Sequence, residues 1–295
     1  MKNKHPKLNS TVLMSDASNF DVSQAINPYY IASEVNSNRA EKELHELQKL
    51  LVQAGVNVIQ VPSPLGCQDG IYTANWALVR GEKAILARLP EARKHEEFYA
   101  EKILKDLGKE IVYLPDGLKF SGQGDALACG DLLFCGQGYR SDEEAQKVAA
   151  KELGYQRIQL QTVPLLDKDF KQITNQSSGW SDSYFYDIDL ALAVIKVPTS
   201  KKRGLIAYCP EAFTPESQNI LDNLQEIDKI EVSIEEAKNG FATNLISTGE
   251  IVIMSSNAPN LTKELRHHGL KVHTLPLNEI SKGGGFIRCT ALTLD

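Results

Sequence analysis

The sequence is short of basic residues. It has 32 Lys and Arg against 38 Asp and Glu, which gives a formal net charge of -6 and a pI of about 5.6. Nucleic acids and anionic membrane surfaces are bound through clusters of basic residues, because their phosphates must be neutralised. The charge balance therefore argues against both as main partners and favours a small cationic ligand.

Long apolar runs are also missing. No stretch has the length of a membrane-spanning helix, and the first residues, MKNKHPKLNSTVLMSD, contain no apolar segment of the kind found in signal peptides. The five cysteines are odd in number and show no C-x-x-C spacing, so neither a disulfide framework nor a zinc site is indicated. These absences predict a cytoplasmic protein that needs no metal and no cofactor.

What the sequence does contain is a recurring pattern of helix and strand. Apolar residues recur at helical spacing, each such segment ends near a glycine or turn, and a strand pattern follows. Five helices are predicted in this way: 38–54, 91–107, 142–153, one that opens at Thr214-Pro215 and one near Thr262.

Each unit continues through a polar loop into a second apolar strand: YTANWALVRG, GDALACGD, DIDLALAVI, ATNLISTG and RCTALTLD. Repeats of this kind imply a stacked or radial architecture with shared cores. The last strand has no downstream partner, and the early strand STVLMSD has no preceding helix. We therefore predict that the segment from Thr11 to Met14 pairs with the segment from Thr290 to Leu294 and closes five units around a central channel.

A doubly wound dinucleotide-binding sheet is the alternative architecture. Gly136-Gln137-Gly138 follows a strand and precedes a helix, as the phosphate-binding turn of that fold does. The third glycine is replaced by serine, and no acidic residue ends a second strand about twenty positions later. We interpret these glycines as turn residues.

The loops between the paired strands carry an unusual set of side chains. A radial arrangement would bring them to one centre: Asp69, Asn75, Asp125, Asp187, Asp189, Asn244 and Cys289. Asp and Asn often occur in turns because they cap the local backbone, and that explanation applies to each of them singly. Carboxylates gathered in a buried centre, however, repel one another unless a cation neutralises them. A planar guanidinium or amidinium pairs well with carboxylates.

The motifs in these loops resemble those of the amidinotransferase and dimethylarginine dimethylaminohydrolase family, the pentein group that includes arginine deiminases. The matching stretches are Asn27-Pro28, DGIYTAN at 69–75, GQGDAL at 122–127, GYR at 138–140, Thr243-Asn244 and the terminal GGG-x-x-x-C. The resemblance covers nearly the whole chain. It implies an α/β fold, a five-bladed α/β propeller of ββαβ-type units around a central channel, formed as a single domain over 1–295.

The resemblance also implies a chemistry. In this family a cysteine thiolate, here Cys289, attacks the guanidinium carbon and forms a covalent intermediate that water or an amine then resolves. It assigns guanidinium binding to Asp69 and Asp125, and a substrate carboxylate to Arg140. The remaining residues expected to bind substrate are Asn75, Asp189, Asn244, Gly284 and Gly285. We expect the glycines to let the backbone approach a flat ligand closely.

Two positions depart from the family pattern. Its usual histidine, in Y-H-x-D, is Asp187 here, and its usual glutamate, in F-E-G, is Ser121. A carboxylate beside Cys289 should keep the thiol protonated until a cationic substrate arrives, with Asp187 then acting as acid or base. The sequence thus predicts a hydrolase or amidinotransferase of guanidino or amidino compounds. The alternative is a catalytically impaired pentein that binds an arginine-like ligand, and a homodimer is left open.

Overall fold

The computed structural model describes residues 6–30, 34–276 and 278–295. Within them the strands form five three-stranded sheets. In spatial order the sheets are β15(Leu292–Thr293)-β1(Thr11–Ser15)-β2(Asn57–Val61), β3(Ala77–Arg80)-β4(Lys83–Leu86)-β5(Glu110–Val112), β6(Ala126–Cys129)-β7(Leu132–Gln137)-β8(Gln156–Gln161), β9(Leu192–Lys196)-β10(Gly204–Tyr208)-β11(Ile227–Glu231) and β12(Ile246–Ser247)-β13(Ile251–Ser255)-β14(Lys271–Leu275).

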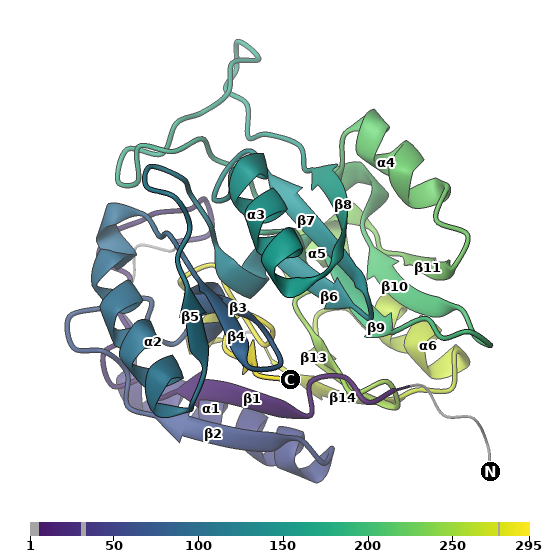
Figure 1. The fold of residues 1–295 in the computed structure, drawn as a ribbon, viewed down its shortest axis with the longest axis horizontal. Helices are drawn as coiled ribbons and strands as arrows, with labels where there is room; N and C mark the ends of the chain where they lie inside the picture. The colour runs from purple at the N-terminus through teal and green to yellow at the C-terminus, as the bar shows by residue number, and fades with distance from the viewer. Residues whose placement is uncertain (1–5, 31–33, 277) are drawn as a thin grey trace.

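All five sheets share one topology. The middle strand is antiparallel to the first strand and parallel to the third. A parallel connection needs a crossover, and a helix supplies it in every unit. These helices are α1(Ser37–Gln53), α2(Lys94–Asp106), α3(Glu143–Leu153), α4(Pro215–Asp222) and α6(Pro259–His267). They follow one another around the view of Figure 1, with the strands toward its middle.

The helical periodicity in the sequence has a direct cause in the packing. In α1 the buried side chains are Ala40, Leu44, Leu47 and Leu51, which form one face of the helix. Thr214 caps α4 by accepting a hydrogen bond from the Ser217 N–H, as the Thr-Pro pair predicts. The short helix α5(Ile234–Gly240) lies outside the repeat and was not predicted.

The predicted pairing of the segment from Thr11 to Met14 with the segment from Thr290 to Leu294 is confirmed. Strand β1 pairs antiparallel with β15, in the register Val12 with Thr293 and Leu13 with Leu292. Thr73, in the TAN motif, ties this seam together, because its hydroxyl donates to the Leu13 carbonyl at 2.8 Å and accepts from the Leu292 N–H at 3.1 Å. The two ends of the chain therefore share one sheet.

The first strands of the units lie side by side inside the molecule. Strand β15 packs beside β3, β6 beside β9, and β9 beside β12. One cavity of about 300 Å³ is lined by residues from all five units, including Leu78, Leu127, Val194, Leu245 and Thr293.

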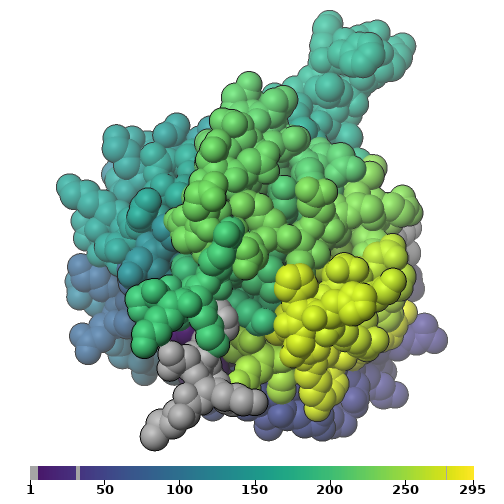
Figure 2. Space-filling view, turned by 90° about the vertical axis from the view of Figure 1, so that its right-hand side faces the viewer, coloured from purple at the N-terminus to yellow at the C-terminus, as the bar shows by residue number. Residues whose placement is uncertain are grey.

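Between β8 and β9 the chain leaves the body of the molecule. Isolated bridges join Leu166 to Gln172 and Thr174 to Ser181, so the excursion is a hairpin-like arm. It projects clearly in both overall views (Figures 1 and 2). In the described part of the chain, every helix is too short or too polar to cross a bilayer.

Candidate active site

Cys289 lies in the loop that enters β15, and its side chain is almost fully buried. The Asn244 side-chain amide donates to its Sγ at 3.1 Å, and the thiol in turn faces Asp189 Oδ2 at 3.4 Å. Its carbonyl accepts the Ala74 N–H at 3.0 Å. The thiol therefore has a fixed orientation. The carboxylate in contact with it is Asp189, whereas the sequence led us to expect Asp187.

Asn244 holds the loop that carries the thiol. Its Oδ1 accepts three backbone N–H groups, from Phe286 at 3.1 Å, Arg288 at 3.0 Å and Cys289 at 3.3 Å. With the bond to Sγ, both ends of the Asn244 amide are used within the protein. Its expected role as a substrate ligand is not what these contacts indicate, because they position the cysteine.

The glycine loop has a packing explanation that the sequence did not provide. A Cβ on Gly284, which has φ 86°, would lie 2.4 Å from Asn27 Oδ1. A Cβ on Gly285 would lie 2.7 Å from the Tyr72 ring and 2.9 Å from Cys289 Cβ. We expected these glycines to admit a flat ligand. Their immediate neighbours are instead side chains of the protein, and these alone require glycine.

Three buried carboxylates form an acidic cluster beside the thiol: Asp125, Asp187 and Asp189. Each has one oxygen without a hydrogen-bond partner among the described residues, namely Asp125 Oδ2, Asp187 Oδ1 and Asp189 Oδ1. Buried polar atoms are nearly always hydrogen-bonded, so three unpartnered carboxylate oxygens in one place point to a missing partner.

The electrostatics of this acidic cluster follow from burial and crowding. Burial, and then the charge of Asp187, raises the pKa of both Asp125 and Asp189 well above the usual value. Burial also raises the pKa of Asp187, with Arg140 opposing. The pKa of the Cys289 thiol is raised well above its usual value by burial and then by Asp189 and Asp187. Burial and the neighbouring acids therefore disfavour the thiolate form of Cys289.

Asp69 lies in a different group, which we call the Arg93 cluster. Arg93 pairs with Glu96 through Nη2 to Oε2 at 2.6 Å and Nε to Oε1 at 2.9 Å, and its Nε lies 3.9 Å from Asp69 Oδ2. Asp69 Oδ1 accepts the Tyr30 hydroxyl at 2.6 Å. Asp69 thus already faces a guanidinium that belongs to the protein.

Asn75 connects the Arg93 cluster with the acidic cluster. Its Oδ1 accepts from Arg93 Nη1 at 2.8 Å, and its Nδ2 donates to Asp187 Oδ2 at 2.8 Å and to Ser121 Oγ at 2.9 Å. All its polar atoms are occupied by the protein. Asp187 and Ser121, the two positions at which the sequence analysis expected a departure from the family pattern, therefore meet at one amide.

Two more arginines border the acidic cluster. Arg140 is buried with its guanidinium 4.3 Å from the centre of the Tyr186 ring, and its Nη2 donates to the Ile26 carbonyl at 2.9 Å. Arg288 donates to Gln123 Oε1 at 2.9 Å. Among the described residues neither arginine lies within ion-pairing distance of a carboxylate.

The sequence did not indicate Arg93, Glu96, Tyr186 or Arg288. Arg93 and Glu96 stand in the charged stretch EARKHEE, where a spacing of three reads as an exposed helical pair. The one available signal was the position of Arg288 immediately before the predicted nucleophile. In the described ranges no group of three or more His, Cys, Asp or Glu side chains has the geometry of a metal site.

The family model described as N,N dimethylarginine dimethylhydrolase, eukaryotic, matches residues 14–294. The chain belongs to this family. Among family relatives, it is 29% identical over 280 residues to the N(G),N(G)-dimethylarginine dimethylaminohydrolase of Mycobacterium tuberculosis, which covers 93% of this chain and 82% of that protein. Related proteins also include arginine deiminases of Borrelia.

A second group of relatives is bifunctional. The chain is 27% identical over 286 residues to the arginine dihydrolase/ornithine cyclodeaminase ArgZ of Synechocystis. The matched region is 95% of this chain but only 37% of ArgZ. The crystal structure of the N-terminal domain of ArgZ bound to product matches with a TM-score of 0.81 and 26% identity over 97% of both chains. The structure of DDAH from Pseudomonas aeruginosa complexed with citrulline shares the fold, with 18% identity and a TM-score of 0.73 over 97% of this chain and 99% of that chain.

Proposed function

We propose that the chain is a cysteine-dependent hydrolase that cleaves a C–N bond of a guanidino or amidino compound through a covalent intermediate on Cys289. The observation that carries this proposal is the acidic cluster of Asp125, Asp187 and Asp189, with three unpartnered oxygens beside a positioned thiol. The related hydrolases and deiminases of arginine and dimethylarginine support it.

The proposed architecture is a single domain over 1–295 with its five units arranged as the blades of a propeller. The common topology of the sheets, the closure of β1 on β15 and the cavity shared by all five units support this arrangement. In it the loops that precede the first strands meet at one end of the central channel. That end carries the thiol and the acidic cluster.

The substrate cation completes the acidic cluster. A guanidinium offers several N–H donors in one plane, which match carboxylate oxygens at Asp125, Asp187 and Asp189. Its positive charge favours the ionised forms of these groups and of Cys289 together. Binding therefore provides the thiolate that the empty site disfavours. Arg140, which has no carboxylate partner among the described residues, is the group that we expect to bind a carboxylate at the far end of the substrate.

The first step forms a bond between Cys289 Sγ and the guanidinium carbon. The thiol proton passes to Asp189, the carboxylate in contact with it, and from there to the leaving nitrogen as one C–N bond breaks. An amine or ammonia departs, and the amidino carbon stays on sulfur.

The second step returns the cysteine to its starting state. Water bonds to the carbon, Asp187 takes one of its protons, and the C–S bond breaks to release a ureido product. The second proton of that water passes to the sulfur as it leaves, and Asp187 gives its proton to the amine or ammonia released in the first step. An amine in place of water would give amidino transfer, so product analysis separates the two outcomes.

Intact-mass measurement after incubation with arginine, dimethylarginine and agmatine tests the proposal. We expect an added mass located on Cys289 and a ureido product for at least one compound. Thermal stabilisation by these compounds without an adduct or any turnover would establish a binding protein and contradict the hydrolase.

The labelling rate of Cys289 by a neutral alkylating reagent tests activation by the substrate. Labelling should be slow at about pH 7 and should increase only above about pH 8.5, the value of a free thiol, because burial and the neighbouring acids raise the pKa of Cys289. A small guanidinium should accelerate labelling at about pH 7. A plateau reached below about pH 7 without ligand would contradict this account. Asp187→Asn should increase the resting rate but remove turnover.

A further inference from the structure

The cavity among the first strands opens away from Cys289. Leu78, Leu127 and Val194 line it, and so do Gly130 and Asp295, which stand after the distal ends of their strands. The thiol and the acidic cluster stand at the opposite ends of the same strands. The cavity of about 300 Å³ is therefore a separate space from the proposed active site. Its size falls at the lower end of small-molecule sites.

Two polar side chains on the wall of this cavity have unused hydrogen-bonding capacity. Thr243 is 1% exposed and its hydroxyl has no hydrogen-bond partner among the described residues. Arg288, 9% exposed, lines the same cavity and donates to Gln123 and to the Ala291 carbonyl, which leaves further N–H groups of its guanidinium. Both stand on the side of the cavity nearest the active site.

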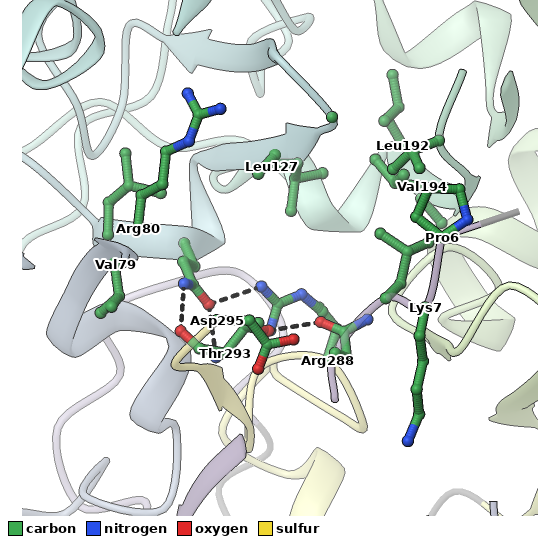
Figure 3. A pocket seen from close by; sticks show the side chains of 18 of the residues that line it. Pro6, Lys7, Val79, Arg80, Leu127, Leu192, Val194, Arg288, Thr293 and Asp295 are labelled. Atoms are coloured by element: carbon green, nitrogen blue, oxygen red, sulfur yellow. Dashed lines mark hydrogen bonds between the residues drawn. The ribbon is translucent and has the colours of Figure 1, made fainter. Parts of the chain in front are cut away.

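The other charged residues around the cavity have partners elsewhere. Arg80 pairs with Asp131 at 2.5 Å, and Lys7 donates to the Gly55 carbonyl. The Asp295 carboxylate accepts from the Ser10 N–H at 2.6 Å and the Thr11 N–H at 2.7 Å. In Figure 3 the Lys7 and Arg80 side chains point away from the space between Leu127, Val194 and Arg288. Among the described residues, Arg288 is thus the cation that faces the cavity.

We propose that this cavity binds a small carboxylate with an aliphatic body. Arg288 and Thr243 would hold the carboxylate, and the body would lie against Leu78, Leu127 and Val194. One guanidinium and one hydroxyl match the two oxygens of a carboxylate, and the aliphatic walls exclude a strongly hydrated ligand. A cationic ligand is disfavoured because it would face Arg288.

The same two residues adjoin the groups that position the nucleophile. Thr243 precedes Asn244, whose side-chain amide donates to Cys289 Sγ. Arg288 precedes Cys289, and its backbone N–H donates to Asn244 Oδ1. An anion on Arg288 adds negative charge near Asp189 and the thiol, so it should slow the labelling of Cys289. This link rests on the role of Cys289 proposed above, whereas the binding itself does not.

Calorimetric titration with hexanoate, hexanamide and hexylammonium tests the binding, since these probes share an aliphatic chain and differ in charge. Hexanoate should bind at least about tenfold more tightly than hexanamide, and hexylammonium should not bind. Thr243→Val should weaken hexanoate binding several-fold. Ala128→Phe should abolish it, because Ala128 is exposed to the cavity and its substitution removes no packed side chain.

Ile220→Phe, on the exposed face of α4, is the matched control and should bind hexanoate normally. Equal affinity for hexanoate and hexanamide, or unchanged hexanoate binding by Ala128→Phe, would overturn the proposal. The labelling rate of Cys289 with saturating hexanoate is the second readout. If hexanoate binds but does not slow the labelling of Cys289, the binding site stands and its link to the thiol is refuted. Neither result depends on whether guanidino compounds are hydrolysed.

Discussion

Two buried groups of acids stand next to each other in this fold and are balanced in different ways. In the Arg93 cluster, Asp69 and Glu96 surround a guanidinium supplied by the protein, and Glu96 binds it through two short contacts. In the acidic cluster, Asp125 and its neighbours have unpartnered oxygens and no such cation within ion-pairing distance among the described residues. Only the second group is chemically incomplete.

The comparison shows that the source of the positive charge distinguishes a structural group of acids from a functional one. An internal arginine makes a buried carboxylate part of the folded framework, and removing either partner leaves an uncompensated charge. A buried carboxylate without an internal partner destabilises the folded protein when no ligand is bound. It also favours the binding of a cationic ligand, which supplies the missing positive charge. Asn75 contacts both groups, so the framework also positions the reactive part.

The largest expected effect comes from Cys289→Ser, which keeps a hydroxyl in the place of the thiol. We expect turnover and the covalent adduct to disappear, with a loss of about 10⁴-fold or more, because the hydroxyl is a far weaker nucleophile without a strong base. Cys67→Ser, at another buried cysteine, should retain turnover. Turnover that survives in the Cys289 variant would remove the nucleophile from the proposed reaction.

The next effect concerns the Arg93 cluster and is one of stability. Glu96→Gln breaks the two-point pair with buried Arg93, and we expect it to lower the free energy of unfolding by about 3–5 kcal/mol. Urea denaturation of the unliganded protein measures this change. A loss below about 1 kcal/mol would mean that Arg93 does not depend on Glu96, and the comparison between the two groups would fail.

A third prediction compares ligand binding by the two groups. Asp125→Asn should weaken binding of a guanidinium ligand by about 1.5–3 kcal/mol, the usual contribution of a hydrogen bond to a charged group. Asp69→Asn should weaken it by less than about 1 kcal/mol, because Asp69 is already occupied by Tyr30 and Arg93. Calorimetric titration of both variants decides the matter, and equal losses would place Asp69 back among the ligands, where the sequence put it.

Much of the framework was predictable because it depends on periodic patterns. The repeat of helix and strand, and the two unmatched strands at the ends, were sufficient to predict the pairing of β1 with β15. Local hydrophobic spacing decides such features, since each unit must bury one helical face.

The division between the two acid groups was not predictable from the same patterns. Asp69 and Asp125 occupy equivalent loops, and what distinguishes them is Arg93, which is supplied by a neighbouring helical turn whose sequence reads as solvent-exposed. The need for glycine at 284 and 285 likewise depends on Asn27 and Tyr72, which are distant in sequence. Pairings of this kind are tertiary, so no local signal encodes them.

The smallest effect is the pH dependence of stability that Asp125 contributes. The pKa of Asp125 is raised in the folded state by burial and by Asp187, so the folded protein binds a proton that the unfolded chain has released. Stability from this group is fully present below the unfolded pKa of about 3.9 and is lost as the pH rises through the folded value.

Asp125→Asn keeps an acceptor for the Ile188 N–H and removes the titration. The variant should match the wild type near pH 3.5 and exceed it by about 1–3 kcal/mol at neutral pH. A saturating guanidinium ligand should reverse this order, because it supplies the charge that ionised Asp125 lacks. Denaturation curves across the pH range measure the difference, and an Asn variant that is less stable than the wild type at neutral pH without ligand would show that Asp125 already has its counter-charge inside the protein.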